Sequence, residues 1–355
     1  MLFWLLIRGL LSIASLTAVY SQRPVPWHDP SPHASQFVIV DKDVRLEVLD
    51  WGGAGGPVVL LSGGGNTAHV FDEFAPKLAR NYHVYGITRR GFGKSTYAPV
   101  GNDTDRLGED VFAVIRNLKL DKPVLVGHSI AGAELSSVAT QHAGAVAGVI
   151  YLEAAYPYAF DNGQGPSMKE FGELQGSGPQ PPSPSKSDLA SFSALQKWDA
   201  QVYGFQLPES EFHETWESTP DGRPDKPRDF PGSQSFMTIM TNTKKYSRIA
   251  VPALAIFAIP HVREAWMINS ADPGVHKDAD AYWAKVDTLA EKQAKAFEDG
   301  VPSAHVVRLR GMHYVYISNE FDVLCEMRSF MSDLRWAGCR TGTRSLSPRS
   351  AVSEI

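Results

Sequence analysis

The chain has 355 residues, of which 43% are hydrophobic and 21% charged, and its formal net charge is −5. This length allows about two domains of roughly 150 residues, or one large α/β domain with an insertion. The negative charge argues against nucleic acid as a partner, since nucleic-acid-binding proteins are normally basic. The two cysteines, Cys325 and Cys339, are too few for a disulfide framework or a cysteine-rich zinc module.

Residues 1–21 form an apolar segment interrupted by Arg8 and followed by polar residues and prolines. This pattern is typical of a secretory signal peptide, with Val19 and Ser21 at the small-residue positions before a cleavage site. An uncleaved membrane anchor is the alternative, because the segment before Arg8 is already hydrophobic. We therefore expect a secreted or periplasmic protein, or one anchored by residues 1–21, with any membrane association confined to this segment.

Apolar runs suited to strands alternate with helical patterns along most of the chain. The predicted strands are Gln36–Asp41, Val44–Trp51, Pro57–Leu61, His83–Thr88, Pro123–Val126, Val146–Leu152, Val251–Ile259 and Ala304–Leu309. Helical patterns are centred on 71–79, 109–118, 130–142, 279–297 and 319–334. This alternation predicts βαβ units and a mostly parallel sheet covered by helices on both faces.

The alternation stops between residues 156 and 247, where prolines, glycines and serines are frequent and aromatic residues are interspersed. We interpret this segment as a cap inserted between two parts of the core, residues 36–155 and 248–336. The alternative is a long surface excursion that is partly disordered at 163–187. Residues 337–355 are polar and are expected to form a disordered tail.

The motif Gly127-His128-Ser129-Ile130-Ala131-Gly132 follows a predicted strand and opens a predicted helix. A serine in this context sits on a sharp strand-to-helix turn, which exposes its hydroxyl above the sheet. Small residues must flank such a serine because strand and helix crowd it. The motif therefore predicts that Ser129 is a nucleophile.

A glycine-rich loop, Ser62-Gly63-Gly64-Gly65-Asn66, follows the buried strand Pro57–Leu61. Consecutive glycines let backbone N–H groups approach a ligand closely. We expect the amides of Gly64 and Ile130 to form an oxyanion hole.

His313 comes directly after the last predicted strand, in Arg310-Gly311-Met312-His313-Tyr314. A general base must reach the serine from a loop at the same edge of the sheet, and His313 is placed to do so. The spacing of the other histidines suggests no metal site, and neither a metal nor an organic cofactor is expected.

These residues give the chain a resemblance to the α/β-hydrolase fold superfamily from about Gln36 to Leu334. Residues 88–95 (TRRGFGKS) are similar to a D-x-R-G-x-G-x-S segment of that family, with Thr88 in place of the acid. Ser62 stands where many members have histidine. The resemblance implies a mostly parallel eight-stranded sheet with helices on both faces and a cap inserted after the sixth strand.

The triad acid is not at the position that the resemblance makes most frequent, because no aspartate follows the seventh predicted strand. Glu153 ends the sixth predicted strand, where some members place their acid. A carboxylate among Leu152, Ala154 and Ala155 would be costly to bury without a partner such as His313. We therefore expect Glu153 to be the acid, with Glu264 and Asp272 as the alternatives.

The sequence thus predicts a serine hydrolase that cleaves a small or medium carboxylic ester through Ser129, His313 and Glu153. A lactonase, thioesterase or peptidase would use the same groups. Acidic residues that could bind a substrate amine in a peptidase are Glu209, Glu211, Glu214 and Glu217, although such a run is more often a solvated helix face. The competing class is a non-catalytic protein that retains the fold for binding.

Overall fold

A computed structural model describes residues 27–174, 178–241 and 245–337. The predicted leader, Cys339 and residues 338–355 lie outside the described residues, so the expected processing and tail stay predictions. Cys325 is exposed on the last helix. Among the described residues, no helix has the length and apolar character needed to cross a bilayer.

The core is one eight-stranded sheet, which confirms the predicted fold class. Its strand order is β1-β2-β4-β3-β5-β6-β9-β10, and the pairs β1–β2 and β2–β4 are antiparallel while the others are parallel. The strands are β1 (Ala34–Asp41), β2 (Val44–Gly52), β3 (Pro57–Leu61), β4 (His83–Ile87), β5 (Val124–His128), β6 (Gly148–Leu152), β9 (Ala253–His261) and β10 (Ala304–Gly311).

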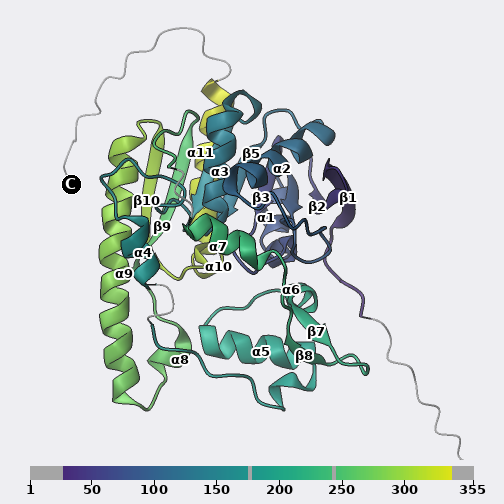
Figure 1. The fold of residues 1–355 in the computed structure, drawn as a ribbon, viewed down its shortest axis with the longest axis vertical. Coiled ribbons are helices and arrows are strands. Elements are labelled where there is room, and N and C mark those ends of the chain that lie inside the picture. Colours follow the sequence, from purple (N-terminus) through teal and green to yellow (C-terminus); the bar gives the residue numbers. More distant parts are fainter. Residues whose placement is uncertain (1–26, 175–177, 242–244, 338–355) are drawn as a thin grey trace, which may run out of the picture.

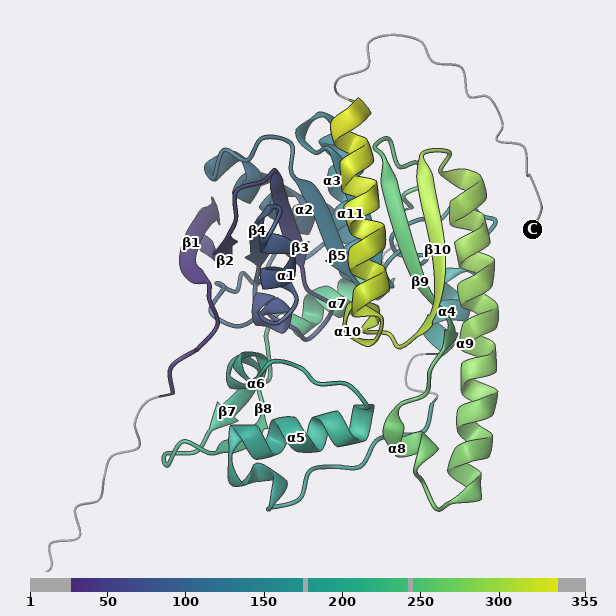
Figure 2. The ribbon, with the colours of Figure 1, turned by 180° about the vertical axis from the view of Figure 1, so that it is seen from behind.

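Helices cover both faces of this sheet, as Figures 1 and 2 show from opposite sides. Alternate residues of one strand enter two separate cores: Val59 and Leu61 belong to one, Val58 and Leu60 to the other. Strands buried on both faces must be apolar throughout, which explains the continuous apolar runs of the central strands. The covering helices are α1 (Ala75–Ala79), α2 (Thr104–Asn117), α3 (Ala131–Gln141), α9 (Pro273–Gly300), α10 (Val315–Ser318) and α11 (Glu320–Ala337), with the 3₁₀ helices η1 (Ala68–Phe71) and η2 (Ala143–Ala145).

Four strands, β2, β5, β9 and β10, are longer at their carboxyl ends than the sequence predicted, and β5 and β9 bear on the site. β5 continues to His128, and β9 continues past Ile259 to His261. Both extensions reach the edge of the sheet that carries Ser129. The helical pattern at 71–79 was predicted as one unit, but it divides into η1 and α1, with Pro76 in the first turn of α1.

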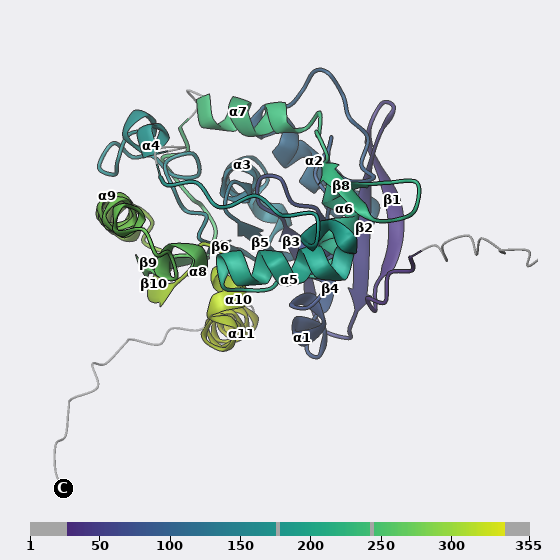
Figure 3. The ribbon, with the colours of Figure 1, turned by 90° about the horizontal axis from the view of Figure 1, so that it is seen from below.

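The segment between β6 and β9 contributes no strand to the main sheet. Its described part contains α4 (Met168–Leu174), η3 (Asp188–Ala190), α5 (Phe192–Tyr203), α6 (Glu209–Thr215), β7 (Trp216–Ser218), β8 (Pro224–Pro227) and α7 (Ser233–Thr241). Figure 1 shows α5, α6 and the β7–β8 hairpin below the core, next to α8 (Ala265–Ile268). In the view from below, α5 lies across the ends of the sheet strands, while α4 and α7 lie to one side (Figure 3). We call residues 156–247 the inserted segment.

Candidate active site

Ser129 occupies a strained turn between β5 and α3. Its φ is 53°, a left-handed conformation that costs free energy for a residue with a side chain. The turn is fixed by two backbone hydrogen bonds: the Ser129 N–H donates to the Leu152 carbonyl at 3.1 Å, and the Gly132 N–H donates to the Ser129 carbonyl at 2.9 Å. The strain therefore persists because the neighbouring strand and helix hold the backbone.

Of the glycines on either side of Ser129, Gly132 is required by space, whereas Gly127 is only crowded. A Cβ added to Gly132 would lie 1.9 Å from the Ala154 carbonyl oxygen, and one added to Gly127 would lie 2.9 Å from Leu135 Cδ1. The first distance is far inside van der Waals contact, so no side chain fits at Gly132. These contacts give the physical reason for the small residues that define the motif.

The structure brings Ser129, His313 and Glu153 together at the carboxyl edge of the sheet. His313 lies between β10 and α10, and its Nε2 is 3.0 Å from Ser129 Oγ. Its Nδ1 is 3.3 Å from Glu153 Oε2. A serine hydroxyl bonded to an imidazole, which is itself bonded to a carboxylate, is the arrangement that can activate a serine oxygen for attack.

Neither alternative acid occupies this position. Glu264 lines the same cavity, but no hydrogen bond joins it to His313 among the described residues. Asp272 caps α9 instead, where its Oδ1 accepts a hydrogen bond from the Gly274 N–H at 2.7 Å. Glu153 is thus the carboxylate within hydrogen-bond reach of His313.

Glu153 is a buried carboxylate that several donors satisfy. Its backbone has a φ of 50°, which mirrors the strained turn at Ser129 on the next strand. The Ala258 N–H donates to Oε1 at 2.7 Å, and the Tyr156 hydroxyl lies 3.0 and 2.9 Å from the two carboxylate oxygens. Burial raises the pKa of Glu153, but hydrogen bonds and charges from His261 and His313 outweigh it and lower this pKa to about 2.

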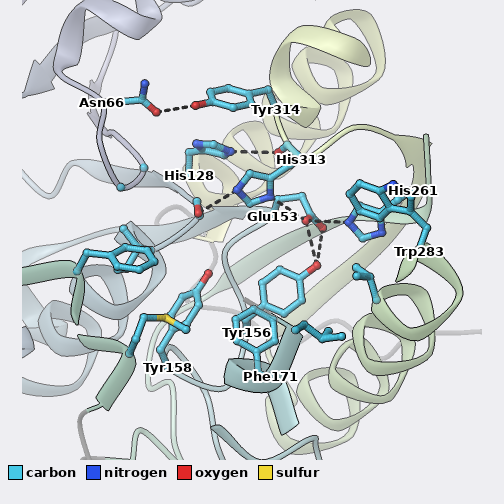
Figure 4. Close-up of a pocket in the computed structure, with 18 of the residues that line it drawn as sticks. Asn66, His128, Glu153, Tyr156, Tyr158, Phe171, His261, Trp283, His313 and Tyr314 are labelled. Atoms are coloured by element: carbon cyan, nitrogen blue, oxygen red, sulfur yellow. Dashed lines mark hydrogen bonds and ion pairs between the residues drawn. The ribbon is translucent and has the colours of Figure 1, made fainter. Parts of the chain in front are cut away.

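A second imidazole, His261, contacts the same carboxylate and was not predicted. Its Nε2 is 3.3 Å from Glu153 Oε2, and its Nδ1 is 2.7 Å from Asp287 Oδ1 on α9. In Figure 4 the rings of His313 and His261 lie on opposite sides of Glu153, with the Tyr156 hydroxyl as a third neighbour. Because both nitrogens of His261 face carboxylate oxygens, both must carry a proton for each to donate.

The charge of His261 follows from that geometry. Burial lowers its pKa, but Asp287 and Glu153 outweigh burial and raise it to about 9. Its side chain is only 3% exposed, so it is a buried imidazolium at neutral pH. The sequence held a signal for it, because His261 follows the predicted seventh strand, Val251–Ile259, where an aspartate was sought; in the structure it is the last residue of β9. Asp287, which completes the pair, lies 26 residues further on in a helix.

The glycine-rich loop packs directly on the serine turn. A Cβ at Gly63 would lie 2.8 Å from His128 Nδ1. Arg89 donates to the carbonyls of Ser62 and Gly63 at 2.8 and 3.3 Å, and its guanidinium pairs with Glu134 on α3 at 2.6 Å. Arg89 therefore ties the loop to the helix that begins at the serine.

The amides predicted for an oxyanion hole face this site. Gly64 and Ile130 both line the cavity at Ser129, and the N–H of each donates to no acceptor among the described residues. Two unused N–H groups beside a nucleophile can receive a developing negative charge.

His128, the residue before Ser129, holds the loop that carries His313. Its Nε2 is 3.0 Å from the His313 carbonyl oxygen. Burial, with a further contribution from the charge of His313, lowers the pKa of His128 to about 3, so the ring is neutral at neutral pH. Since a carbonyl only accepts, Nε2 carries the proton. The sequence motif assigned no role to His128.

All five predicted site residues line one cavity of about 370 Å³. Its apolar wall combines side chains of the inserted segment and of α9. These are Tyr156, Tyr158, Phe171, Leu174, Phe236, Met240, Tyr282, Trp283 and Val286. The cavity is therefore suited to a ligand with one polar, reactive group and an apolar remainder.

The acidic run on α6 does not face the cavity, so the sequence-based suggestion that it binds a substrate amine finds no support there. Glu211 is buried, and it accepts hydrogen bonds from Asn66 and Thr67 beside the glycine-rich loop. Glu209, Glu214 and Glu217 pair with His213, Lys94 and Lys226. For Glu211, the prediction of a solvated face was also wrong, because this side chain joins the inserted segment to the core.

An eight-stranded sheet with a serine turn after β5 and a histidine after β10 defines the α/β-hydrolase class. A model described as "Alpha/beta hydrolase family" matches residues 58–326. The chain belongs to this family.

Individual relatives are more distant. The chain is 32% identical to a non-heme haloperoxidase of Rhodococcus erythropolis over 34% of this chain and 44% of that protein. It is 28% identical to a bifunctional esterase/perhydrolase of Acinetobacter calcoaceticus over 39% of this chain and 52% of that protein. The chain thus spans about half the length of these curated relatives. The crystal structure of E-2-(acetamidomethylene)succinate hydrolase aligns with 84% of this chain and 99% of its own, with a TM-score of 0.57 and 16% identity, and shows the same fold.

Proposed function

We propose that this protein is a serine hydrolase that cleaves a small or medium carboxylic ester through an acyl-enzyme. The observation that carries the proposal is the hydrogen-bonded series Ser129–His313–Glu153, with Ser129 Oγ 3.0 Å from His313 Nε2 at the floor of an apolar cavity. One relative's description as an esterase/perhydrolase agrees with this class of substrate.

In the proposed reaction, His313 Nε2 takes the hydroxyl proton as Ser129 Oγ bonds to the ester carbonyl carbon. The oxyanion that forms accepts hydrogen bonds from the N–H groups of Gly64 and Ile130. His313 then gives the proton to the departing alkoxide, which leaves as an alcohol. A water molecule attacks the acyl-enzyme with His313 again as base, releasing the carboxylic acid.

Glu153 keeps the His313 ring oriented and stabilises the imidazolium that forms during each proton transfer. His261 acts through Glu153 and is a positioning residue. With Tyr156 and the Ala258 amide, it fixes the carboxylate from the sides that His313 does not occupy. Asp287 holds His261 in turn.

The test is hydrolysis of a p-nitrophenyl ester series from acetate through butyrate and octanoate to palmitate. A cavity of about 370 Å³ predicts the highest kcat/KM for short and medium acyl groups and a decline at palmitate. Ser129→Ala should abolish hydrolysis throughout the series. Equal, measurable rates for the parent and Ser129→Ala would contradict Ser129 as the nucleophile, and a folded parent that hydrolyses none of the esters would favour a binding protein with this fold.

A further inference from the structure

A cluster of histidines and carboxylates lies outside the proposed active site, where the chain's N-terminal described residues meet η1 and the inserted segment. It consists of Asp29 and His33, which precede β1, and His69 and Asp72, which lie on η1 and at its end. Their nearest nitrogen and oxygen atoms are all within 4.8 Å of one another. None of these four residues lines the cavity at Ser129.

The two separations from His69 Nδ1 are close to those of ligands around one small cation. His69 Nδ1 lies 3.2 Å from Asp29 Oδ2 and 3.2 Å from Asp72 Oδ2. The two nitrogens of His33 lie 2.8 Å from Asp72 Oδ1 and 3.6 Å from Asp29 Oδ2. Tetrahedral Zn²⁺, with bonds of about 2.0–2.1 Å, separates its ligand atoms by roughly 3.3 Å.

Hydrogen bonding inside the cluster is incomplete. Asp29 Oδ2 and His69 Nε2 are buried atoms that have no hydrogen-bond partner among the described residues. Asp29 Oδ2 is near two imidazole nitrogens without the geometry of a hydrogen bond to either. A buried carboxylate oxygen in this state costs free energy unless something else satisfies it.

The surroundings provide the second layer of contacts that metal ligands normally have. The Trp51 indole N–H and the Ser210 hydroxyl donate to the two oxygens of Asp72 at 3.1 and 2.6 Å. His69 Nε2 lies 3.6 Å from Glu47 Oε1, so the nitrogen that faces away from the cluster points to a buried carboxylate. Imidazole ligands in metal sites commonly present their second nitrogen to a carboxylate in this way.

The local charge also favours a cation. Four carboxylates, of Asp29, Glu47, Asp72 and Glu214, lie within ion-pair distance of His33 or His69. Among the described residues, Lys94 is the one lysine or arginine that pairs with any of them. With neutral imidazoles, three negative charges are left in excess, and a divalent cation would remove two.

We propose that Asp29, His33, His69 and Asp72 bind one divalent transition-metal cation. One nitrogen from each imidazole and one oxygen from each carboxylate, all within 4.8 Å of one another, suit Zn²⁺ best. Sequence spacing did not indicate this site, because the ligands come in two pairs 36 residues apart that the fold of β1, β2 and η1 brings together.

The proposed cation has a structural role. It ties residues 29–33 to η1, and Ser210 on α6 contacts the same Asp72. Trp27 stacks on His213 of α6 at a ring distance of 3.8 Å, so the N-terminal segment also contacts the inserted segment directly. Since η1 follows the glycine-rich loop, a cation here would hold α6 against that loop.

A proton on His69 is the competing occupant. Burial lowers the pKa of His69, but contacts with Asp29, Asp72 and Glu47 outweigh it and raise it to about 12. An imidazolium would then hold the carboxylates without metal. The two states differ in an observable way, because the cation requires Asp29 and His33 as ligands whereas the proton stays with His69.

The experiment uses the full chain, stripped of metal with EDTA and dialysed. Bound Zn²⁺ is counted by mass spectrometry of the metal after equilibration, its affinity is measured calorimetrically, and Co²⁺ supplies the visible spectrum of a four-coordinate site. The variants are Asp29→Asn and His33→Gln, which change residues ahead of the first strand. His142→Gln is the matched control, since it removes a surface histidine paired with Glu109 at 2.7 Å.

We expect one Zn²⁺ per chain, a tetrahedral Co²⁺ spectrum and a raised Tm on metal addition. Asp29→Asn and His33→Gln should each weaken Zn²⁺ binding at least about tenfold, and His142→Gln should bind as the parent does. Substoichiometric binding by the parent, or equal affinity in all four proteins, would overturn the proposal and leave a protonated His69. Ester hydrolysis is not part of the measurement, so the outcome is independent of the proposed function.

Discussion

The two ends of the proposed triad are held in contrasting ways. Ser129 and Glu153 follow adjacent parallel strands, and both have a left-handed backbone, with φ of 53° and 50°. Ser129 is fixed by its own strand and helix and by Gly132, at which no Cβ fits. Glu153 is fixed by polar groups from β9, α9 and its own loop. A nucleophile can thus be positioned by local sequence, whereas a buried acid needs partners from across the fold.

The largest fall in kcat is expected when Ser129 or His313 is replaced. Ser129→Ala and His313→Ala should each lower kcat for a p-nitrophenyl ester by about 10⁶-fold, and the double variant should lose no more, because the two residues act as a unit. Ser332→Ala, on the exposed face of α11, is the control. Losses that multiply in the double variant would contradict a shared role.

Replacing Glu153 should lower kcat less than replacing Ser129 or His313 does. Glu153→Gln keeps the shape but removes the charge that stabilises the His313 imidazolium, so we expect a fall in kcat of about 10⁴-fold. The comparison variants are Glu264→Gln and Asp272→Asn, the alternative acids. If either of these lost more activity than Glu153→Gln in steady-state kinetics, the assignment of the acid would be wrong.

The turn that positions Ser129 can be disrupted by a substitution that removes no polar group. Gly132→Ala places a methyl 1.9 Å from the Ala154 carbonyl oxygen, so the turn must shift. We expect the free energy of unfolding in urea to fall by about 1–3 kcal/mol. Gly144→Ala is the control, because a Cβ there meets nothing within 4 Å. Equal stability of the two variants would show that the turn tolerates a side chain.

The acid end should show an effect of similar size, and one that depends on pH. Because folding raises the pKa of His261 to about 9, its contribution to stability is complete below about pH 6.5 and is lost as pH rises through 9. Between these values the parent should lose on the order of 2–3 kcal/mol that His261→Gln does not lose. Urea unfolding at both pH values measures this.

His305→Gln is the control for that experiment. His305 pairs with Glu326 at the same 3.3 Å separation, but its side chain is 63% exposed. Its substitution should leave the pH dependence of the parent intact. A parallel decline in the parent and in His261→Gln would mean that His261 carries no buried charge.

Much of the fold could be predicted because strands buried on both faces are apolar without interruption. The runs at 57–61, 83–88 and 146–152 mark strands almost to the residue. Strand ends were less certain, since His128 and His261 are polar and look like loop residues. Both continue their strands through backbone pairing, His128 with Leu152 and His261 with Gly311, and both side chains contact the site.

The serine turn and the glycine-rich loop could be predicted because their constraints lie within a few residues of sequence. The Asp287–His261 pair could not, because it joins a strand end to the middle of a helix. Glu211 was misjudged for a related reason: helical spacing placed it among exposed acids, yet its partners Asn66 and Thr67 lie about 145 residues earlier. Long-range polar pairing leaves no periodic signal in one sequence.

The most direct test of the central claim is covalent labelling of the folded parent protein by a fluorophosphonate, followed by intact-mass and peptide analysis. The account predicts one adduct per chain, located on Ser129, with slower labelling in Glu153→Gln and none in Ser129→Ala. A folded parent that forms no adduct, or an adduct that persists in Ser129→Ala, would contradict the claim that the turn after β5 carries an activated serine.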